Sequence, residues 1–544
     1  MFTDLFKKLA KIAWFLPGFL LWAAYPPMGE RMDCLFALAP LLWLSRREPD
    51  ERVVAKRWFQ SGIFFWVATL SWMPAIVKNG GPWPLVVLGW FALAAYCSLY
   101  FWLYGYLSAH VWCWARRGSY GRRLGAVLLA EPILWCGLEL VRSRFLGGFS
   151  WNQLGVVPVN SGFGAPAALG GVYLCSAVVI LINGTFAGIA ERVWKPERSG
   201  FQNLNRLGIL ETLLAFALVF ALYQTSQTSQ TSQTSLKVAM IQRNFPCVFQ
   251  AQEENPYEIY GRLLGNVAAL RPDLVVLPES ALCEFGPVDQ QGAVDFAAWL
   301  SEKTDGAALL AGGTRYEEGL TYNSAVLYTS QTSQTSQTSQ TSQTSRTSQT
   351  FSVYDKVHLV PFGEFIPGDK LFPALQKLAP VGSCTSGELK LLTLARTGQP
   401  DVRLGCAICF EDTDSAQVRA LATKGAQALV FITNDSWFSQ SIETEQHAWQ
   451  ATARAIETGL PVVRVGNSGV SGTVAADGKP SWLVGSGGRP LVDRQGTMFD
   501  RIQLPMRDEG GLTPYVVLGD LPLGLAFALL ILSLIVVKYR HRYE

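Results

Sequence analysis

The sequence predicts an α-helical membrane bundle joined to an α/β domain. Three observations support this fold class: long apolar runs fill residues 1–223, residues 236–519 have the composition of a soluble domain, and strand-like and helix-like runs alternate there. The chain is 49% hydrophobic and 16% charged, whereas about a quarter of the residues of soluble globular proteins are charged. A net charge of only +3 gives no indication of a nucleic-acid partner.

Membrane spans are predicted where about 20 mostly apolar residues follow one another. Candidate runs lie at 10–26, 33–45, 58–77, 85–112, 124–141, 165–190, 207–223 and 521–537. The first two are short and interrupted by proline, so they form either two full spans or a re-entrant pair. The chain then divides into a bundle of about seven spans (1–223), a linker (224–235), the α/β domain (236–519) and a C-terminal span with its tail (520–544).

Lysine and arginine concentrate in alternate connections between these runs, and loops rich in them remain in the cytoplasm. The basic set is Lys7, Lys8, Lys11, Arg46, Arg47, Arg52, Lys56, Arg57, Arg116, Arg117, Arg122, Arg123, Arg192, Lys195, Arg198, Arg206, Lys538, Arg540 and Arg542. The opposite set holds only Arg31, Lys78, Arg142 and Arg144. We therefore expect both termini in the cytoplasm and the α/β domain in the periplasm of a Gram-negative cell, provided that the first two runs count as two spans.

Two tracts of Gln-Thr-Ser repeats interrupt the chain, at 224–235 and at 329–350. Neither contains apolar residues whose burial could offset the entropy lost on ordering. The second tract separates two strand-like runs, Asn323–Tyr328 and Phe351–Val360, where a hairpin turn is expected. Long insertions there cost little, because the closure entropy of a loop grows only logarithmically with its length. We interpret both tracts as repeat expansions that loops tolerate, without a binding function.

Short apolar runs rich in β-branched residues predict the strands of the α/β domain. They are Val238–Gln242, Leu274–Leu277, Ala307–Ala311, Val402–Ile408, Leu429–Ile432 and Val462–Val465. Helical patterns lie between several of them, at 256–269, 415–424 and 443–458. This alternation predicts a largely buried sheet, with functional side chains where strands end and loops begin.

Three predicted strand ends carry residues of complementary chemistry: Glu279, Lys356 and Cys409. Each alone has a structural explanation, as a neighbour of a helix cap, a solvated strand residue or a small buried side chain. Together they supply a base, a cation and a nucleophile, because a carboxylate can deprotonate a thiol and an ammonium can stabilise both the thiolate and a tetrahedral oxyanion. A cysteine–histidine pair through His358 or His447 remains open, although no local pattern flanks either histidine.

The motifs around these residues resemble the nitrilase superfamily and, within it, the apolipoprotein N-acyltransferase family. The matching stretches are QRNFP (242–246), LPES (277–280), YNSA (322–325), YDKVHLVPFGEFIP (354–367), AICFE (407–411), NDSWF (434–438) and RVGNSG (464–469). In the membrane part, residues 139–142, 148–153 and 515–520 also look like the family. The resemblance covers nearly the whole chain outside the repeats.

The resemblance implies an α-β-β-α sandwich for the α/β domain, with a catalytic triad on Glu279, Lys356 and Cys409. Glu364 and Glu411 match acidic positions that support the site in the family. The triad works without a metal or another cofactor, so neither is expected.

Other positions follow the family less closely. Phe410 stands where the family often has tyrosine, and Trp437 and Phe438 match a possible substrate loop. The family commonly has a Lys-Trp pair a few residues after Pro246, whereas this chain reads Gln250-Ala251. That departure puts one substrate contact in doubt and leaves the triad intact.

The reaction that the resemblance implies is a ping-pong acyl transfer in lipoprotein biosynthesis. An acyl chain passes from a membrane phospholipid to a thioester on Cys409, and then to the α-amine of the diacylglyceryl cysteine of an apolipoprotein. The enzyme would be a monomer in the bacterial inner membrane. The alternatives are a membrane-tethered amidase that hydrolyses a C–N bond, and a transporter or scaffold with an inactive enzyme domain. The predicted spans contain few charges, chiefly Glu131 and Glu139, which argues against the transporter.

Overall fold

The computed structural model describes residues 13–194, 234–246, 254–331, 348–368, 383–505 and 512–543. The chain forms two compact units, Met1–Ser229 with Thr513–Glu544, and Gln230–Leu512. The predicted span at 207–223, the pair Gln250-Ala251 and most of both Gln-Thr-Ser tracts lie outside the described residues.

The first unit is helical. Five of its described helices are long and apolar enough to cross a membrane: Glu51–Asn79, Trp83–Arg116, Gly121–Arg142, Ala167–Ala190 and Leu521–Tyr539. Each covers one of the predicted runs, so the prediction of a polytopic bundle is confirmed. The first two predicted runs instead contain the short helices α2 (Leu16–Ala23) and α3 (Ala39–Arg47). Both are well below the roughly 20 residues that a span requires, which favours the re-entrant pair.

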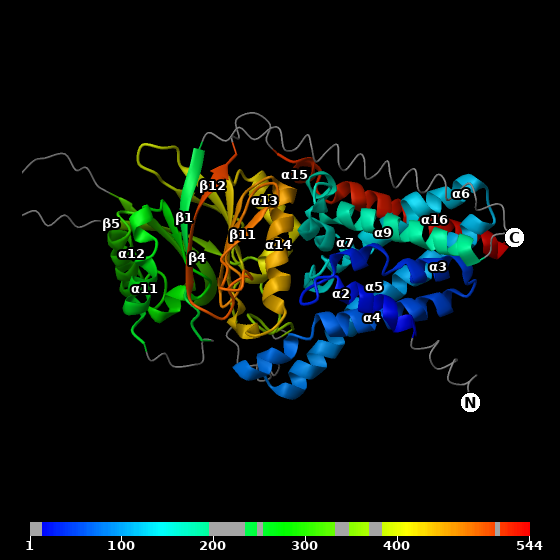
Figure 1. The fold of residues 1–544 in the computed structure, drawn as a ribbon, viewed down its shortest axis with the longest axis horizontal. Helices are drawn as coiled ribbons and strands as arrows, with labels where there is room; N and C mark the ends of the chain where they lie inside the picture. Colours follow the sequence, from blue (N-terminus) through cyan, green and yellow to red (C-terminus); the bar gives the residue numbers. More distant parts are fainter. Residues whose placement is uncertain are drawn as a thin grey trace, which may run out of the picture. The chain divides into compact units, whose positions relative to one another are not determined.

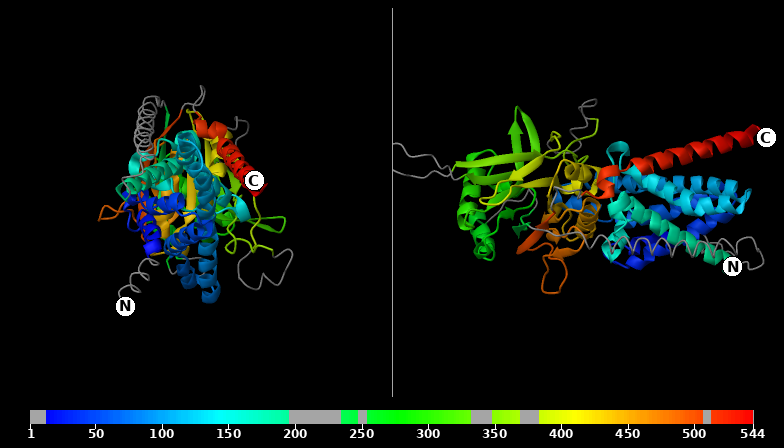
Figure 2. Two further views of the ribbon diagram at one scale, coloured as in Figure 1. Left: turned by 90° about the vertical axis from the view of Figure 1, so that its right-hand side faces the viewer. Right: turned by 90° about the horizontal axis from the view of Figure 1, so that it is seen from above.

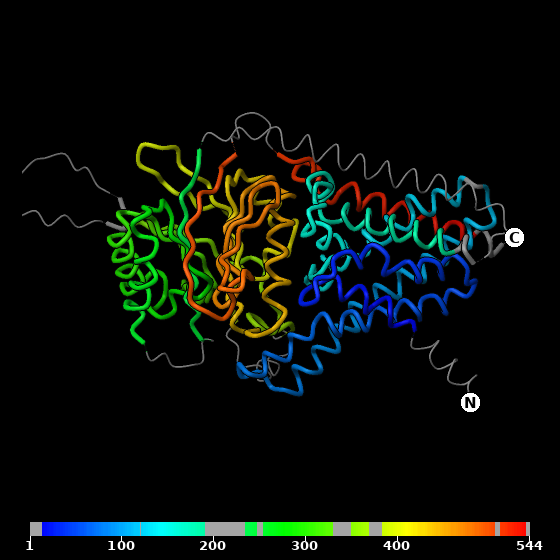
Figure 3. The backbone as a smooth tube through the Cα atoms, in the orientation of Figure 1, coloured from blue at the N-terminus to red at the C-terminus, as the bar shows by residue number. Residues whose placement is uncertain are grey.

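Close packing joins distant parts of this unit. The C-terminal helix α16 (Leu521–Tyr543) contacts α7 (Glu131–Arg142), and Figure 3 shows the red C-terminal trace beside the cyan helices. A Cβ atom at Gly137 would lie 2.1 Å from Cδ2 of Phe527, so glycine is required there. Arg46 and Glu131 form a buried ion pair at 2.8 Å, and Trp112 Nε1 donates to the same carboxylate at 2.8 Å. The buried carboxylate is thus paired and hydrogen-bonded, as a charge inside a bundle must be.

The second unit is built on two six-stranded sheets, ordered β12-β1-β2-β3-β4-β5 and β11-β10-β9-β8-β7-β6. The first comprises β1 (Thr234–Gln242), β2 (Leu274–Val276), β3 (Ala308–Glu317), β4 (Leu320–Gln331), β5 (Ser348–Asp355) and β12 (Gly496–Leu504). The second comprises β6 (Leu391–Leu394), β7 (Val402–Ile408), β8 (Ala428–Asn434), β9 (Val462–Asn467), β10 (Gly472–Val474) and β11 (Pro480–Trp482). In each sheet three central strands are parallel, β1-β2-β3 and β7-β8-β9, and the remaining pairs are antiparallel.

Successive side chains of each strand point to opposite faces of its sheet and so pack in different layers of this unit. Val238 and Met240 of β1 belong to the apolar core that both sheets share, whereas Ala239 and Ile241 pack with the helices of the first sheet. Those helices are α11 (Pro256–Leu264) and α12 (Gln291–Lys303), and α13 (Ser415–Thr423) and α14 (Glu443–Thr458) pack on the second sheet. Figures 1 and 2 show this order of layers, which confirms the α-β-β-α sandwich.

The strands β4 and β5 form the predicted hairpin around the second repeat tract. Their pairing runs from Ser324 with Asp355 to Gln331 with Ser348. β5 ends at Asp355, five residues earlier than the expected run to Val360. The backbone N–H of Lys356 still donates to the carbonyl of Asn323, but those of Val357 and His358 turn to a buried carboxylate.

Candidate active site

The carboxyl ends of three strands bring the predicted triad together. Glu279 follows β2, Lys356 follows β5, and Cys409 follows β7 as the first residue of the 3-10 turn η11 (Cys409–Thr413). The ammonium of Lys356 lies 4.0 Å from Oε1 of Glu279, and both charges act on the Cys409 thiol. Cys409 has a φ of 54°, a left-handed conformation that costs about 1–3 kcal/mol and tends to occur at functional sites.

Glu279 is held as a buried carboxyl group with two donors. Asn323 Nδ2 donates to Oε1 at 2.7 Å, and the backbone N–H of Asn434 donates to Oε2 at 2.8 Å. Burial raises the pKa of Glu279 and Glu364 adds to the rise, while Lys356 and the two donors oppose it. A Cβ atom at Gly312 would lie 2.5 Å from the Cα of Glu279, so only glycine fits behind the base.

Lys356 is 1% exposed and is paired with a second carboxylate. Its Nζ lies 2.9 Å from Oε1 of Glu364, which also accepts from Asn323 Nδ2 at 2.7 Å. Burial opposes the charge of Lys356, but Glu364, Cys409 and Glu279 together raise its pKa, so the group stays an ammonium. Lys356 lowers the pKa of Glu364 against the effect of burial, and the backbone N–H of Val360 supports that carboxylate at 2.8 Å.

The surroundings of Cys409 favour the neutral thiol over the thiolate. Burial, followed by the negative charge of Glu279, raises its pKa to about 12, and the charge of Lys356 opposes the rise. A protonated thiol is a weak nucleophile, so the site needs a base at the moment of attack. Glu279 fits that role, since its raised pKa brings it closer to neutrality and makes it a better proton acceptor.

Glu411 ties two of the three strand ends together. Its Oε1 accepts the backbone N–H groups of Val357 at 2.7 Å and His358 at 3.0 Å, and its Oε2 accepts that of Ile408 at 2.8 Å. The hydroxyl of Tyr354 adds a bond at 3.0 Å. One buried carboxylate therefore holds the segment after Lys356 against the residue that precedes Cys409.

The remaining predicted residues are less directly placed. The ring of Phe410 stands edge-to-face to His358, 5.8 Å between centroids. Trp437 and Phe438 end the turn η12 (Asp435–Phe438) and are partly exposed. The contact of these three rings with a substrate stays a prediction.

Sequence reasoning missed two residues that hold the base. Asn323 and Asn434 both lie in family-like stretches, YNSA and NDSWF, but neither was given a role. Asn323 donates to the carboxylates of both Glu279 and Glu364. Each is an amide side chain on a strand of the α/β domain, close to the end of another strand. Amino-acid composition does not reveal that proximity, so the sequence did not identify either residue.

The cysteine–histidine alternative does not fit the geometry. Nε2 and Nδ1 of His447 face the carboxylates of Asp412 at 3.0 Å and Asp435 at 3.2 Å, which leaves neither nitrogen directed at a thiol. His358 Nδ1 lies 3.8 Å from Asp414. Cys406 stands three residues before Cys409, the spacing of a Cys-x-x-Cys pair, but both thiols are free and Cys406 is wholly buried in the core between the sheets.

One cluster of possible metal ligands lies in the described part of the chain. Asp435, Glu443 and His447 offer donor atoms within 4.8 Å of one another. The guanidinium of Arg464 lies 3.2 Å from Asp435 and 2.7 Å from Asp412, so the cluster already contains its own cation. We interpret it as an ion-pair network.

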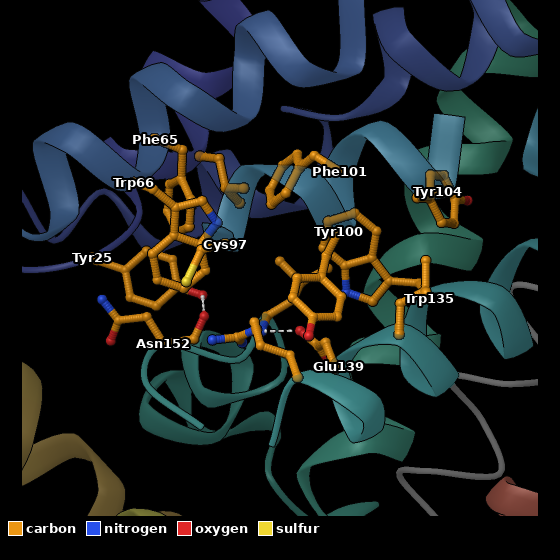
Figure 4. Close-up of a pocket in the computed structure, with 14 residues that line it drawn as sticks. Tyr25, Phe65, Trp66, Cys97, Tyr100, Phe101, Tyr104, Trp135, Glu139 and Asn152 are labelled. Carbon is orange, nitrogen blue, oxygen red and sulfur yellow. Dashed lines mark hydrogen bonds between the residues drawn. The ribbon is translucent and has the colours of Figure 1, made fainter. Parts of the chain in front are cut away.

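A cavity of about 30 Å³ lies inside the helical unit, lined mainly by aromatic side chains (Figure 4). This volume holds one or two water molecules. Arg142 at its wall lies 4.7 Å from the ring of Trp66 and donates to the carbonyls of Phe149 and Trp151. Glu139 accepts the N–H of Leu154 at 2.8 Å. The space is too small for a lipid, so it is not a candidate for the reaction.

Comparisons with known proteins cover both units. The family model "Apolipoprotein N-acyltransferase N-terminal domain" matches residues 17–185, and the model "Carbon-nitrogen hydrolase" matches residues 220–496. A protein of Geobacter metallireducens named apolipoprotein N-acyltransferase is 29% identical, and the alignment covers 85% of this chain and 84% of the relative. One of Photobacterium profundum with the same name is 26% identical, over 95% and 93%. Among solved structures, an amidase from Nesterenkonia sp. AN1 aligns at 17% identity and a TM-score of 0.34, over 50% of this chain and 93% of the amidase.

Proposed function

The chain belongs to the carbon–nitrogen hydrolase family, and from this premise we propose that it is an N-acyltransferase of lipoproteins. The observation that carries the proposal is a combination: a base, an ammonium and a thiol lie at three adjoining strand ends, in a chain that also has the membrane domain of the N-acyltransferase relatives. Those relatives match over both parts of the chain, which favours a transferase over a simple amidase.

The first half-reaction loads the thiol. Glu279 takes the proton of Cys409 while the sulfur attacks the carbonyl carbon of a phospholipid acyl ester. Lys356 stabilises the oxyanion of the tetrahedral intermediate. The C–O ester bond then breaks, the lysophospholipid oxygen takes the proton from Glu279, and a thioester remains on Cys409.

The second half-reaction unloads it. The α-amine of the diacylglyceryl cysteine of an apolipoprotein attacks the thioester carbonyl, and Lys356 again supports the oxyanion. The C–S bond breaks, and Glu279 accepts a proton from the amine and passes it to the thiolate of Cys409. The product is an amide, and the enzyme returns to its starting state.

Transfer to an amine must outcompete hydrolysis of the thioester. Both proposed substrates are lipids, so a site tethered to a membrane meets them at high local concentration. Exclusion of water from the loaded site would protect the thioester until the amine arrives. The runner-up function, a membrane-tethered amidase, would instead pass its acyl group to water.

The location follows from charge and span number. The concentration of lysine and arginine in alternate loops supports a cytoplasmic position of both termini and a periplasmic position of the catalytic domain, at the inner membrane of a bacterial cell. If α2 and α3 form a re-entrant pair, they add no crossing. The number of crossings before the catalytic domain then stays odd, with the predicted span at 207–223 included. The enzyme would act as a monomer.

The test is the intact mass of the purified protein, in detergent with added phospholipid, before and after hydroxylamine. We expect an added acyl mass that hydroxylamine removes, and no such mass in Cys409→Ser, because an alcohol is far less ionised than a thiol. The exposed Cys283 provides the control Cys283→Ser, which should load normally. Release of a fatty acid to water in the presence of a lipopeptide amine, without amide formation, would instead support the amidase.

A further inference from the structure

Five buried charged side chains form a network beside the active site. His447 of α14 lies 3.0 Å from Asp412 through Nε2 and 3.2 Å from Asp435 through Nδ1. Arg464 of β9 bridges the same two carboxylates, at 2.7 Å and 3.2 Å. Glu443, one helical turn before His447, lies 3.3 Å from Nδ1. None of these residues is more than 3% exposed.

The two bridged carboxylates stand on the two turns that carry the chemistry. Asp412 belongs to η11, which begins with Cys409. Asp435 opens η12 and directly follows Asn434, whose N–H holds Glu279. The network therefore connects the turn that begins with Cys409 to Asn434, the residue that donates to Glu279.

The contacts favour a doubly protonated imidazole. An ionised carboxylate only accepts hydrogen bonds, and both ring nitrogens of His447 lie within hydrogen-bond distance of aspartate carboxylates, so each nitrogen would donate to one of them. Asp412 and Asp435 are then balanced by His447 and Arg464, and an ionised Glu443 would be one negative charge in excess. Consistent with this, burial, followed by the charge of Asp435, raises the pKa of Glu443 to about 7.

We propose that His447 is a positioning residue, held as an imidazolium, that locks the turn of Cys409 to the turn supporting Glu279 and keeps a positive charge beside the reacting thiolate. The proposal rests on the proposed function only for the role of Cys409 as nucleophile. Its tests use no substrate, so they remain decisive if the acyl-transfer proposal fails.

The charge of His447 favours the thiolate of Cys409. Burial, followed by the charges of Glu279 and Asp435, raises the pKa of Cys409, whereas Lys356 and His447 lower it. The titratable and charged groups that face His447 are Asp412 of η11, Asp435 of η12, Arg464 of β9 and Glu443 of its own helix. Loss of the imidazolium would leave the two aspartates with one cation and make the thiolate harder to form.

The first experiment measures the protonation state in the unaltered protein. The chain has only four histidines, so a sample labelled with ¹⁵N-histidine gives a simple spectrum. Between pH 6 and pH 9, we expect one imidazole to keep both ring nitrogens protonated. The variants His110→Gln, His358→Gln and His541→Gln should each leave that signal in place. Four neutral imidazoles at pH 9 would overturn the proposal.

The second experiment measures the pH dependence of Cys409 alkylation by iodoacetamide, read by peptide mass spectrometry on the full chain in detergent. In His447→Gln we expect alkylation of Cys409 at a fixed pH below its pKa to slow about tenfold, because removal of a nearby opposite charge usually raises a pKa by about one unit or more. The exposed Cys283 in the same sample is the internal control and should not change. An unchanged Cys409 profile in the folded variant would rule out the charge coupling.

A milder variant keeps the test open if His447→Gln does not fold. Glu443→Gln preserves the size of the side chain and cannot ionise. At alkaline pH, where an ionised Glu443 would add a negative charge to the network in the wild type, Cys409 should react faster in the variant than in the wild type. Equal rates at every pH would show that the network does not act on the thiol and would refute the proposal.

Discussion

Lys356 is paired with Glu364, its ammonium 2.9 Å from the carboxylate Oε1. The proposed base, Glu279, lies farther away at 4.0 Å. The two carboxylates therefore differ in their proposed roles. Glu364 keeps a low pKa and fixes the ammonium, while Glu279 keeps a raised pKa and remains able to take a proton.

Replacing Lys356 with methionine should abolish most activity. The change keeps the volume of the stem and removes the charge that stabilises both oxyanions, and loss of one such donor typically costs about 100- to 1000-fold in rate. We expect at least that loss in both half-reactions, measured as single-turnover acylation of Cys409 and as transfer to a lipopeptide amine. Acylation at the wild-type rate would show that the lysine is structural.

The same variant also leaves Glu364 buried without its cation. Breaking a buried pair in this way costs about 3–5 kcal/mol of stability. The double variant Lys356→Met/Glu364→Gln removes the unpaired charge, so it should recover stability in a denaturant titration but not acylation. Lys356→Arg should not restore the rate, because a planar guanidinium does not replace a compact ammonium in a closed site.

Asn323→Ala should shift the acid limb of the acylation rate to higher pH. Asn323 donates to the carboxylate of Glu279 and so opposes the rise in its pKa. Without that donor the base stays protonated to a higher pH, and the rate falls first under mildly acidic conditions. Single-turnover acylation across pH 5–8 measures the shift.

The neighbouring Tyr322 supplies the control for this experiment. Its ring lies 4.4 Å from the guanidinium of Arg315, and Tyr322→Phe keeps the ring. That variant should reproduce the wild-type profile. An acid limb at the same pH in Asn323→Ala and wild type would mean that Glu279 is not the group that controls it.

Glu411→Gln should impair the site through the backbone. The carboxylate accepts N–H groups on both oxygens, from Val357, His358 and Ile408, and glutamine would turn an NH2 group towards one set of donors. We expect slower acylation together with loss of stability, measured by denaturant titration. Phe410→Tyr, next to it and partly exposed, restores the common residue of the family and should leave both quantities close to wild type. A stable, fully active Glu411→Gln protein would contradict this role.

Glu279, Lys356 and Cys409 could be singled out from the sequence because each follows the end of a strand. Strand periodicity is local, so Val402–Ile408 and the helix 443–458 were placed with the observed bounds. Hydrogen bonds across the sandwich are not local, and the contacts of Asn323 with both carboxylates depend on a pairing that no spacing reveals. The sequence did not decide whether the first two apolar runs, which contain α2 and α3, form full spans or a re-entrant pair. Hydropathy depends on composition and does not give the length of a helix.

Cys406 shows how local reasoning about faces can mislead. Cys406 and Cys409 are three positions apart, and two such residues on one strand would lie on opposite faces, which predicts a nearly silent Cys406→Ser variant. In the structure Cys409 already belongs to the following turn, and Cys406 lies in the apolar core between the sheets. A serine hydroxyl buried there without a hydrogen-bond partner would lower the stability of the protein by about 1–3 kcal/mol. Cys283 is therefore the better thiol control.

The second repeat tract offers a prediction about stability as well as activity. The described strands pair up to Gln331 and Ser348, and the residues 332–347 join their ends. Replacing these residues by an Asn-Gly turn should keep acylation at the wild-type rate, since the tract contains no group suited to the chemistry. Three halvings of the loop length should also add up to about 2 kcal/mol of stability, because each doubling costs about 0.6 kcal/mol.

A matched control separates length from composition. Replacing the same residues by an equally long Gly-Ser segment should leave both stability and acylation as in wild type, because a flexible loop of that length closes at a similar entropic cost. Denaturant titration and intact-mass acylation provide the two measurements. An inactive but well-folded Asn-Gly variant, beside an active Gly-Ser variant, would show that the length of this hairpin matters to the reaction. Inactivity of both would show that the Gln-Thr-Ser sequence itself has a role.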